Sequence, residues 1–229
     1  MSAGLSRELI AVRVGRELIE RRYLDLPPGR LVVNLGFGLP AEICSYVPDD
    51  APIFFHSENG CLGYGPLAGA DEGDPDTING GSLMVTLQPW ASFVPSAEAF
   101  AMIRRGKVDV VVLGGLEVAA NGDLANWKVP GRKSGGVGGA ADLCAGCKRV
   151  VVAMEHRTKR GEPRLVEHCR YELTGAGCVD LIVTDLAVVQ VTPTGFLLRE
   201  IAPGWAVEEV QAATGAPLPP ADDLREMDL

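Results

Sequence analysis

The chain has 229 residues, 47% of them apolar and 22% charged, and its 21 basic and 30 acidic residues give a formal net charge of −9. This composition is typical of a globular protein and argues against a disordered or fibrous chain. Its length predicts a single domain over residues 1–229. Neither a long basic run nor an apolar stretch of about 20 residues is present, so we expect no nucleic-acid partner, no membrane span and a cytoplasmic protein.

Six cysteines are scattered along the chain, a distribution that favours reduced, mostly buried thiols over a disulfide framework. Cys144 and Cys147 alone have the spacing of metal ligands. A single CxxC pair with no second pair is a weak signal for zinc or redox chemistry. The three histidines are dispersed, and we expect no metal site.

The first half of the chain alternates between helical and strand patterns. Ser6 is a candidate cap for a helix whose apolar residues recur at helical spacing. Strand patterns follow over residues 30–36 and 51–56, with a short proline-initiated helix at residues 40–47 between them. A further strand is expected at residues 83–87, and then a helix from Ser96 that Gly106 would end.

The second half contains two continuous apolar runs, VDVVVLGG and KRVVVAM. Runs without alternation are typical of strands that are covered on both faces. They predict an α/β fold with a mixed, partly parallel central sheet flanked by helices. A C-terminal β-hairpin is expected around residues 192–195, then a last helix, and from about residue 216 a loosely held acidic tail.

The stretch FHSENGCLG, residues 55–63, has two interpretations. Asn59 and Gly60 are a preferred pair for a tight turn, so Glu58 could simply face water in a hairpin. Alternatively, the strand ends by presenting Glu58 above the edge of the sheet, where ligands of open α/β sheets gather. The local pattern by itself favours the turn.

A glycine cluster, GVGGAA, occupies residues 136–141. It fits a dinucleotide fingerprint poorly, because no strand precedes it. Glycines do let backbone amides approach a ligand closely, so the segment could bind a phosphate or a developing oxyanion. A flexible or closely packed loop explains the same residues equally well.

Many landmarks follow one another in a fixed order between about residues 31 and 217. They are NLGFGLP, HSENGCLGYGP, DTINGG, ASF, SAEAFAMIRRGKVD, GDLANWKVPG, GGVGGAADL, VVAMEH, LTGAG and IVTDLAV. In this order they resemble the beta subunit of the class I CoA-transferases, the family of succinyl-CoA:3-oxoacid and 3-oxoadipate CoA-transferases.

The resemblance implies that Glu58 is the catalytic nucleophile and that CoA is a substrate, with no separate cofactor. A carboxylate nucleophile keeps the acyl groups activated, as ping-pong transfer through a glutamyl-CoA thioester requires. The remaining site residues implied are Asn34, Asn59, Gly60, Asn126, Gly138, Gly139 and Ala140. Asn34 and Asn126 match substrate-binding positions, Gly60 would allow close approach of the substrate, and the last three match the loop beside the glutamate.

Three positions depart from the family pattern. Ser82 replaces a lysine that is a natural partner for a substrate carboxylate, which puts a dicarboxylate such as succinate in doubt. Trp90 replaces a glycine and adds bulk, and Cys61 follows SENG where the family has a hydrophobic residue. The departures affect the choice of substrate more than the catalytic assignment.

The resemblance also implies a partner, a CoA-transferase alpha subunit of related fold, in a hetero-oligomer that we expect to be a heterotetramer. The expected substrates are a short acyl-CoA and a carboxylic acid, with 3-oxo acids leading. Two alternatives remain open: a CoA-ester hydrolase or lyase on the same fold, and a noncatalytic CoA-binding partner subunit.

Overall fold

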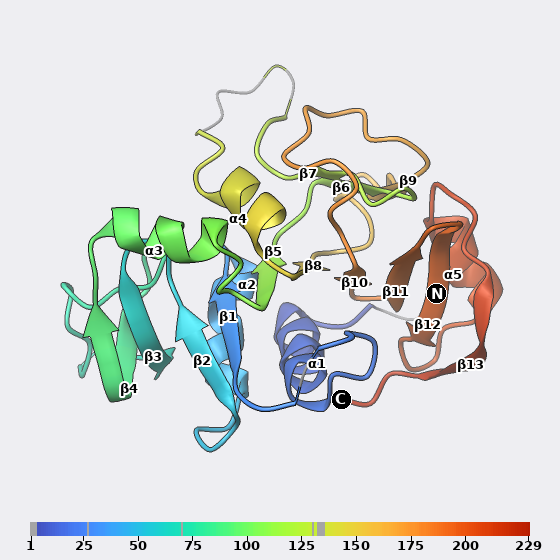
Figure 1. Ribbon diagram of the computed structural model, residues 1–229. Coiled ribbons are helices and arrows are strands. Elements are labelled where there is room, and N and C mark those ends of the chain that lie inside the picture. Colours follow the sequence, from blue (N-terminus) through green and yellow to red (C-terminus); the bar gives the residue numbers. More distant parts are fainter. Residues whose placement is uncertain (1–3, 27, 70, 130, 132–135) are drawn as a thin grey trace.

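The computed structural model describes residues 4–26, 28–69, 71–129, 131 and 136–229. A ten-stranded sheet runs through the molecule in the order β13-β12-β11-β10-β8-β5-β1-β2-β3-β4 (Figure 1). Its strands are β1 (Leu31–Leu35), β2 (Ile53–His56), β3 (Cys61–Leu67), β4 (Val85–Phe93), β5 (Val110–Leu113), β8 (Arg149–Ala153), β10 (Leu181–Val183), β11 (Ala187–Thr192), β12 (Gly195–Ile201) and β13 (Pro220–Glu226).

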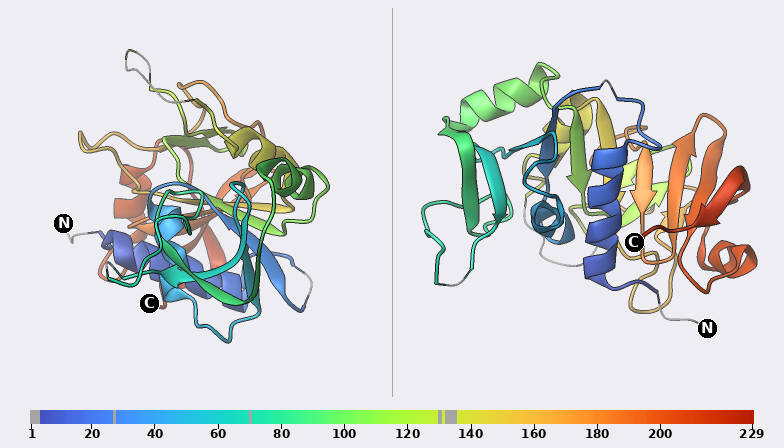
Figure 2. Two further views of the ribbon diagram at one scale, coloured as in Figure 1. Left: turned by 90° about the vertical axis from the view of Figure 1, so that its left-hand side faces the viewer. Right: turned by 90° about the horizontal axis from the view of Figure 1, so that it is seen from below.

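The middle of the sheet is parallel and its two ends are largely antiparallel. Strands β10, β8, β5, β1 and β2 run parallel to one another. The β2–β3 and β3–β4 pairs are antiparallel at one end, and so are the β10–β11 and β11–β12 pairs at the other (Figure 2, right). The expected mixed, partly parallel sheet and the C-terminal hairpin at Thr192 and Gly195 are therefore confirmed.

The helices are short apart from the first. They are α1 (Arg7–Glu20), α2 (Leu39–Glu42) with the 3-10 turn Ile43–Tyr46, α3 (Ser96–Arg104), α4 (Ala140–Gly146) and α5 (Val207–Ala213). The Ser6 hydroxyl accepts a hydrogen bond from the Leu9 amide and caps α1 as predicted. Ser96 is not the cap of α3, because Pro95 occupies that position without a side-chain bond.

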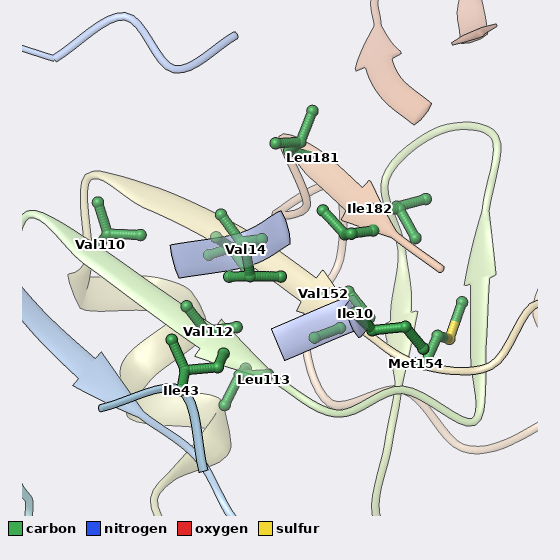
Figure 3. Packing of buried hydrophobic residues seen from close by; sticks show 14 of the residues in the cluster. Ile10, Val14, Ile43, Val110, Val112, Leu113, Val152, Met154, Leu181 and Ile182 are labelled. Atoms are coloured by element: carbon green, nitrogen blue, oxygen red, sulfur yellow. The ribbon is translucent and has the colours of Figure 1, made fainter. Parts of the chain in front are cut away.

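The core forms where α1 packs on the parallel strands. Ile10 and Val14 of α1 lie against Val112, Val152 and Ile182 of the sheet (Figure 3). All five side chains are fully buried. Each contributes roughly 1.5–3 kcal/mol by leaving water, which explains why these strands carry continuous apolar runs.

A buried ion cluster ties α1 to β12. The Arg13 guanidinium donates to Glu200 Oε2 through Nε at 2.7 Å and to Glu17 Oε2 through Nη2 at 3.2 Å. Arg225 Nη2 and the Tyr23 hydroxyl donate to Glu200 Oε1 at 2.9 and 2.8 Å. Burial opposes ionisation of Glu200, but the hydrogen bonds and charge of Arg13 prevail and lower the pKa of this carboxyl.

The C-terminal segment differs from the expected loose tail. Residues 220–226 form β13, which pairs in parallel with β12, and Leu218, Ala221 and Met227 are buried. The acidic residues misled the prediction, because an edge strand can keep charged side chains in water while its backbone pairs with the sheet. The remaining strands, β6 (Glu117–Ala119), β7 (Leu124–Ala125) and β9 (Leu165–Val166), form a separate small sheet.

Candidate active site

Glu58 lies in the turn between the antiparallel strands β2 and β3. The Gly60 amide donates to the Ser57 carbonyl at 3.0 Å and closes this turn. Gly60 has a φ of 104°, which explains the glycine at this position. The predicted turn is therefore present, but Glu58 does not simply face water: it is half-buried and lines a cavity.

Asn34 holds the Glu58 carboxylate from the neighbouring parallel strand. It is paired in register with His56, so the ends of β1 and β2 meet beside the turn. The Asn34 side chain is fully buried, and its Nδ2 donates to Glu58 Oε2 at 3.0 Å. Among the described residues no cationic side chain forms an ion pair with Glu58. One neutral donor thus orients the carboxylate without neutralising it.

Two glycines form walls against Glu58. A Cβ atom at Gly80 would lie 2.8 Å from Glu58 Oε1, and one at Gly139 would lie 3.6 Å from Glu58 Cγ. The second would also lie 3.0 Å from the Phe100 ring. Gly80 belongs to a turn that Asn79 Oδ1 braces by accepting from the Gly81 amide at 2.9 Å. A side chain at Gly80 would displace the carboxylate, whereas one at Gly139 would crowd the Phe100 ring and only touch Glu58.

Glu58 opens into a cavity of about 620 Å³. Among the described residues that line it, Glu58 alone has an ionisable side chain. The others are glycine, alanine, apolar side chains and two polar ones: Gly36, Phe37, Gly80, Leu113, Gly114, Gly115, Leu116, Asn126, Trp127, Gly136, Val137, Gly138, Gly139, Ala140 and Leu143. An apolar site with few polar groups is typical of a small-molecule pocket.

The predicted glycine loop lies on the cavity wall. Gly138, Gly139 and Ala140 lead into α4 and all three line the cavity. Gly138 has a φ of 58°, a conformation that glycine adopts without strain. The loop thus brings backbone, and not bulky side chains, to the space beside Glu58.

Asn126 also lines the cavity, but its side chain braces the wall. Its Nδ2 donates to the Gly114 carbonyl at 3.1 Å, and its Oδ1 accepts from the Thr174 hydroxyl at 2.7 Å. The amide therefore ties the end of β7 to the loop after β5. Its contribution to the site is to fix Gly114 and Trp127 in place.

Asn59 and Gly60 do not line the cavity. The exposed Asn59 donates through Nδ2 to the Ile78 carbonyl at 2.7 Å and so anchors the segment that carries Gly80. A side chain at Gly60 would collide with the Val94 carbonyl, so this glycine allows the backbone just after β4 to approach the turn. Asn59 and Gly60 therefore stabilise the turn through contacts outside the cavity.

The residues that depart from the family pattern lie apart from the cavity wall. Ser82 is exposed with a φ of 60°, and Trp90 is 90% exposed on β4. Cys61 is buried on β3, and burial raises the pKa of its thiol, which favours a packing role.

Other features of the chain gave no second site. The described part of the chain contains no group of three or more His, Cys, Asp or Glu side chains arranged to hold a metal ion. Cys144 hydrogen-bonds with the Cys178 thiol, and burial raises the pKa of Cys147 to about 12. No helix among the described residues is long and apolar enough to cross a bilayer.

Sequence reasoning missed several residues of the wall. Gly80 lies in the DTINGG landmark, whose paired glycines signalled a tight turn but not a contact with Glu58. Phe37 and Trp127 adjoin predicted residues and line the cavity. His56 is buried between Asn34 and the Ala99 carbonyl, and its neighbours in the sequence gave no sign of that position.

Comparison with known proteins gives a consistent result. Residues 17–213 match the family described as coenzyme A transferase. The chain is 45% identical over 215 residues to the B subunit of 3-oxoadipate CoA-transferase from Acinetobacter baylyi, covering 93% of this chain and 95% of that one. It is 43% identical over 212 residues to succinyl-CoA:3-ketoacid coenzyme A transferase 2A, mitochondrial, of Rattus norvegicus, covering 92% of this chain and 41% of that protein.

A solved structure supports the fold. An acyl-CoA transferase from Escherichia coli O157:H7 superimposes with a TM-score of 0.74 at 18% identity, over 100% of this chain and 45% of that one. At this identity the match concerns the fold alone. The chain spans less than half the length of the rat and E. coli proteins.

Proposed function

The chain belongs to the coenzyme A transferase family, and from this premise we propose that it is the B-type, or beta, subunit of an enzyme that moves CoA between a short acyl-CoA and a carboxylate. The observation that carries the proposal is the presentation of Glu58 by a hairpin turn into a cavity lined largely by glycine and apolar side chains, with the Asn34 amide as a donor to its carboxylate. Short 3-oxo acids are the leading acceptor class.

The proposed reaction conserves its bonds and charges through a ping-pong cycle. A Glu58 carboxylate oxygen attacks the acyl-CoA carbonyl, which forms a mixed anhydride and releases CoA thiolate. The thiolate attacks the glutamyl carbonyl, so the donor acid leaves as a carboxylate and a glutamyl-CoA thioester remains. The acceptor carboxylate then repeats the two steps in reverse, and Glu58 is regenerated as a carboxylate.

The surroundings of Glu58 support this chemistry. Each step passes through an oxyanion, and an N–H group already fixed beside that oxygen stabilises it without reorganisation. Asn34 Nδ2 lies 3.0 Å from Glu58 Oε2, which becomes part of the glutamyl carbonyl or its oxyanion. The glycine walls leave room for the acyl group, and apolar side chains disfavour water that would hydrolyse the anhydride.

The cavity also bears on the choice of substrate. No cationic side chain is among the described residues of its wall, and Ser82 stands where the family has a lysine. A second carboxylate would be buried here without a cationic partner among the described residues of the wall, which is costly. We therefore favour a monocarboxylate with a 3-oxo group over a dicarboxylate such as succinate.

We propose that a CoA-transferase alpha subunit completes the site, in a heterotetramer. The Acinetobacter relative is named as one subunit of its enzyme, and the rat enzyme is a chain of which this protein spans only 41%. Both observations favour a second half of related origin.

The proposal is tested by trapping the thioester. The chain is co-expressed with its alpha-type partner, incubated with a panel of acyl-CoAs and digested for mass spectrometry. We expect CoA on the peptide that contains Glu58 in the wild type, no such adduct in Glu58→Ala, and an unchanged adduct in the control Glu72→Gln, an exposed position.

The acceptor panel separates the alternatives. Turnover that depends on an added carboxylate supports transfer, whereas CoA release without an acceptor indicates a hydrolase or lyase. An unmodified Glu58 peptide with every acyl-CoA, together with full turnover in Glu58→Ala, would overturn the nucleophile assignment. Equal use of succinate and acetoacetate would contradict the substrate class.

A further inference from the structure

A chain of three hydrogen-bonded groups leads from the backbone of α3 to Glu58. His56, the last residue of β2, is fully buried beside Asn34. Its Nε2 lies 3.2 Å from the Ala99 carbonyl oxygen, and its Nδ1 lies 3.1 Å from Asn34 Nδ2. The same Nδ2 atom donates to Glu58 Oε2 at 3.0 Å. The imidazole does not line the cavity, and its hydrogen-bonded link to Glu58 runs through Asn34.

The Ala99 carbonyl determines which ring nitrogen of His56 carries the proton. A carbonyl oxygen can only accept, so Nε2 must be the donor. In a neutral ring Nδ1 is then an acceptor, and the facing group of Asn34 must be its NH₂. Burial lowers the pKa of His56, while the Ala99 carbonyl and the charge of Glu58 act in the opposite direction. The lowered pKa keeps the ring in the neutral form.

The oxygen of the Asn34 amide does not fix the orientation of that amide. Asn34 Oδ1 is buried and has no hydrogen-bond partner among the described residues. An amide that is not held through its oxygen can rotate by half a turn at little cost unless its nitrogen is held. When Glu58 is acylated its negative charge is lost, so its carbonyl oxygen holds the amide more weakly and the His56 contact becomes a larger part of the constraint on the amide.

We propose that His56 is a positioning residue of the transfer reaction: its Nδ1 accepts one proton of the Asn34 amide and so directs the second at the oxygen of Glu58. A rotated amide would bring Oδ1 against the carboxylate and, later, against the oxyanion of the tetrahedral intermediate. Removing one donor to an oxyanion costs about 10²–10³ in rate. The expected effect on the rate rests on the proposed function, whereas the hydrogen bonds from Ala99 through His56 and Asn34 to Glu58 are independent of it.

Two substitutions at His56 differ in where they place an amide. His56→Asn puts a carbonyl oxygen near the position of Nδ1, where it can accept from Asn34. His56→Gln places its amide near the position of Nε2 and leaves Asn34 without an acceptor. We expect His56→Gln to slow formation of the glutamyl-CoA thioester by about 10- to 100-fold with little change in KM, and His56→Asn to recover most of that loss.

A double-substitution cycle separates positioning from general support of the fold. In an Asn34→Ala background the amide is gone, so His56→Gln should cost little further rate. A loss of the same size in both backgrounds, or equal rates for wild type, His56→Asn and His56→Gln, would overturn the proposal. Thermal unfolding of each variant, assembled with the alpha-type partner, shows how much of any loss comes from stability.

A second measurement needs no activity. ¹⁵N NMR of histidine-labelled protein reports the protonation of each ring, and the signals that vanish in His56→Gln identify His56. We expect a neutral ring protonated at Nε2 at pH 7. A ring protonated at Nδ1 or at both nitrogens would contradict the proposed hydrogen bonds between Ala99, His56 and Asn34. If the wild type gives this ring but forms no thioester, the proposed function fails and the positioning role falls with it.

Discussion

Two glutamates of the same sheet, Glu58 and Glu200, are held in opposite ways. Glu200 is fully buried and accepts from Arg13, Arg225 and the Tyr23 hydroxyl. Glu58 is half-buried and accepts from the neutral amide of Asn34. Guanidinium groups occupy the lone pairs and neutralise the charge of Glu200, so that carboxylate stabilises the fold and cannot attack a carbonyl. The single donor on Glu58 leaves lone pairs free for chemistry.

The largest expected effect comes from removing the charge of Glu58. Glu58→Gln keeps the size of the side chain but not the nucleophile, so turnover of the assembled enzyme should fall by at least about a thousandfold. The free energy of unfolding should change by about 0.5 kcal/mol or less, because Glu58 forms no ion pair with any described residue. Steady-state assays and denaturant unfolding measure the two. If Glu58→Gln kept a tenth of the wild-type rate, the contrast drawn between Glu58 and Glu200 would be wrong.

At Glu200 we expect the opposite result, a large loss of stability and little effect on thioester formation. Glu200→Gln leaves Arg13 buried without its main counter-charge and should destabilise the protein by about 3–5 kcal/mol. Protein that remains folded should still form the thioester at Glu58, since β12 is remote from β2 in the order of the sheet. Denaturant unfolding measures the loss, with Glu226→Gln, an exposed position on β13, as the matched control. A thioester defect in folded protein would show that the two sites are coupled.

A smaller effect is expected from the wall of the site. Gly80→Ala places a Cβ 2.8 Å from Glu58 Oε1, so the flexible carboxylate must move. A displacement of about 1 Å can cost 10²-fold in rate, and we expect a loss of about 10- to 100-fold with little change in stability. Gly69→Ala is the control, because a Cβ there meets no atom within 4 Å. Equal rates for the two variants would mean that Glu58 tolerates displacement.

The smallest effect concerns a histidine with no part in the reaction. His156 lies between the Thr184 and Thr214 hydroxyls, and burial lowers its pKa from 6.5 to about 3. Between these values the unfolded chain binds a proton that the folded one does not, so stability is lost as the pH falls from 6.5. This histidine alone adds a slope of at most about 1.4 kcal/mol per pH unit.

Unfolding of His156→Gln as a function of pH measures that contribution. The slope below pH 6.5 should be shallower than in the wild type. His168→Gln, at an exposed position, should keep the wild-type slope. An unchanged slope in His156→Gln would show that other groups cause the acid sensitivity.

Much of the fold could be predicted because its signals are local. The continuous apolar runs of β5 and β8 indicated buried parallel strands, and Ser6 indicated the start of α1. The prediction of a loosely held C-terminal tail was wrong because the charged side chains of this segment resemble those of a solvated one. The pairing of β13 depends on the open edge of β12, which no local pattern shows. The Cys144–Cys147 spacing was a weak signal from the start, and in the structure Cys144 lies against Cys178.

For the candidate site, the sequence by itself indicated the turn and, through the family resemblance, the proposed nucleophile. The pattern SENG points to Glu58, and Asn59 and Gly60 form the bend. Only the tertiary structure decided what surrounds the carboxylate. Asn34, Gly80 and Gly139 come from distant parts of the chain, and the register of β1 with β2 and the packing of two loops bring them to Glu58.

The physical reason lies in the range of the forces involved. Turn geometry and strand periodicity depend on neighbouring residues, so a single segment reveals them. The protonation of His56, the orientation of Asn34 and the room beside Glu58 depend on groups that meet only when parallel strands end at a common edge. The sequence thus indicates the proposed nucleophile, and the assembled sheet supplies its orientation and the space beside it.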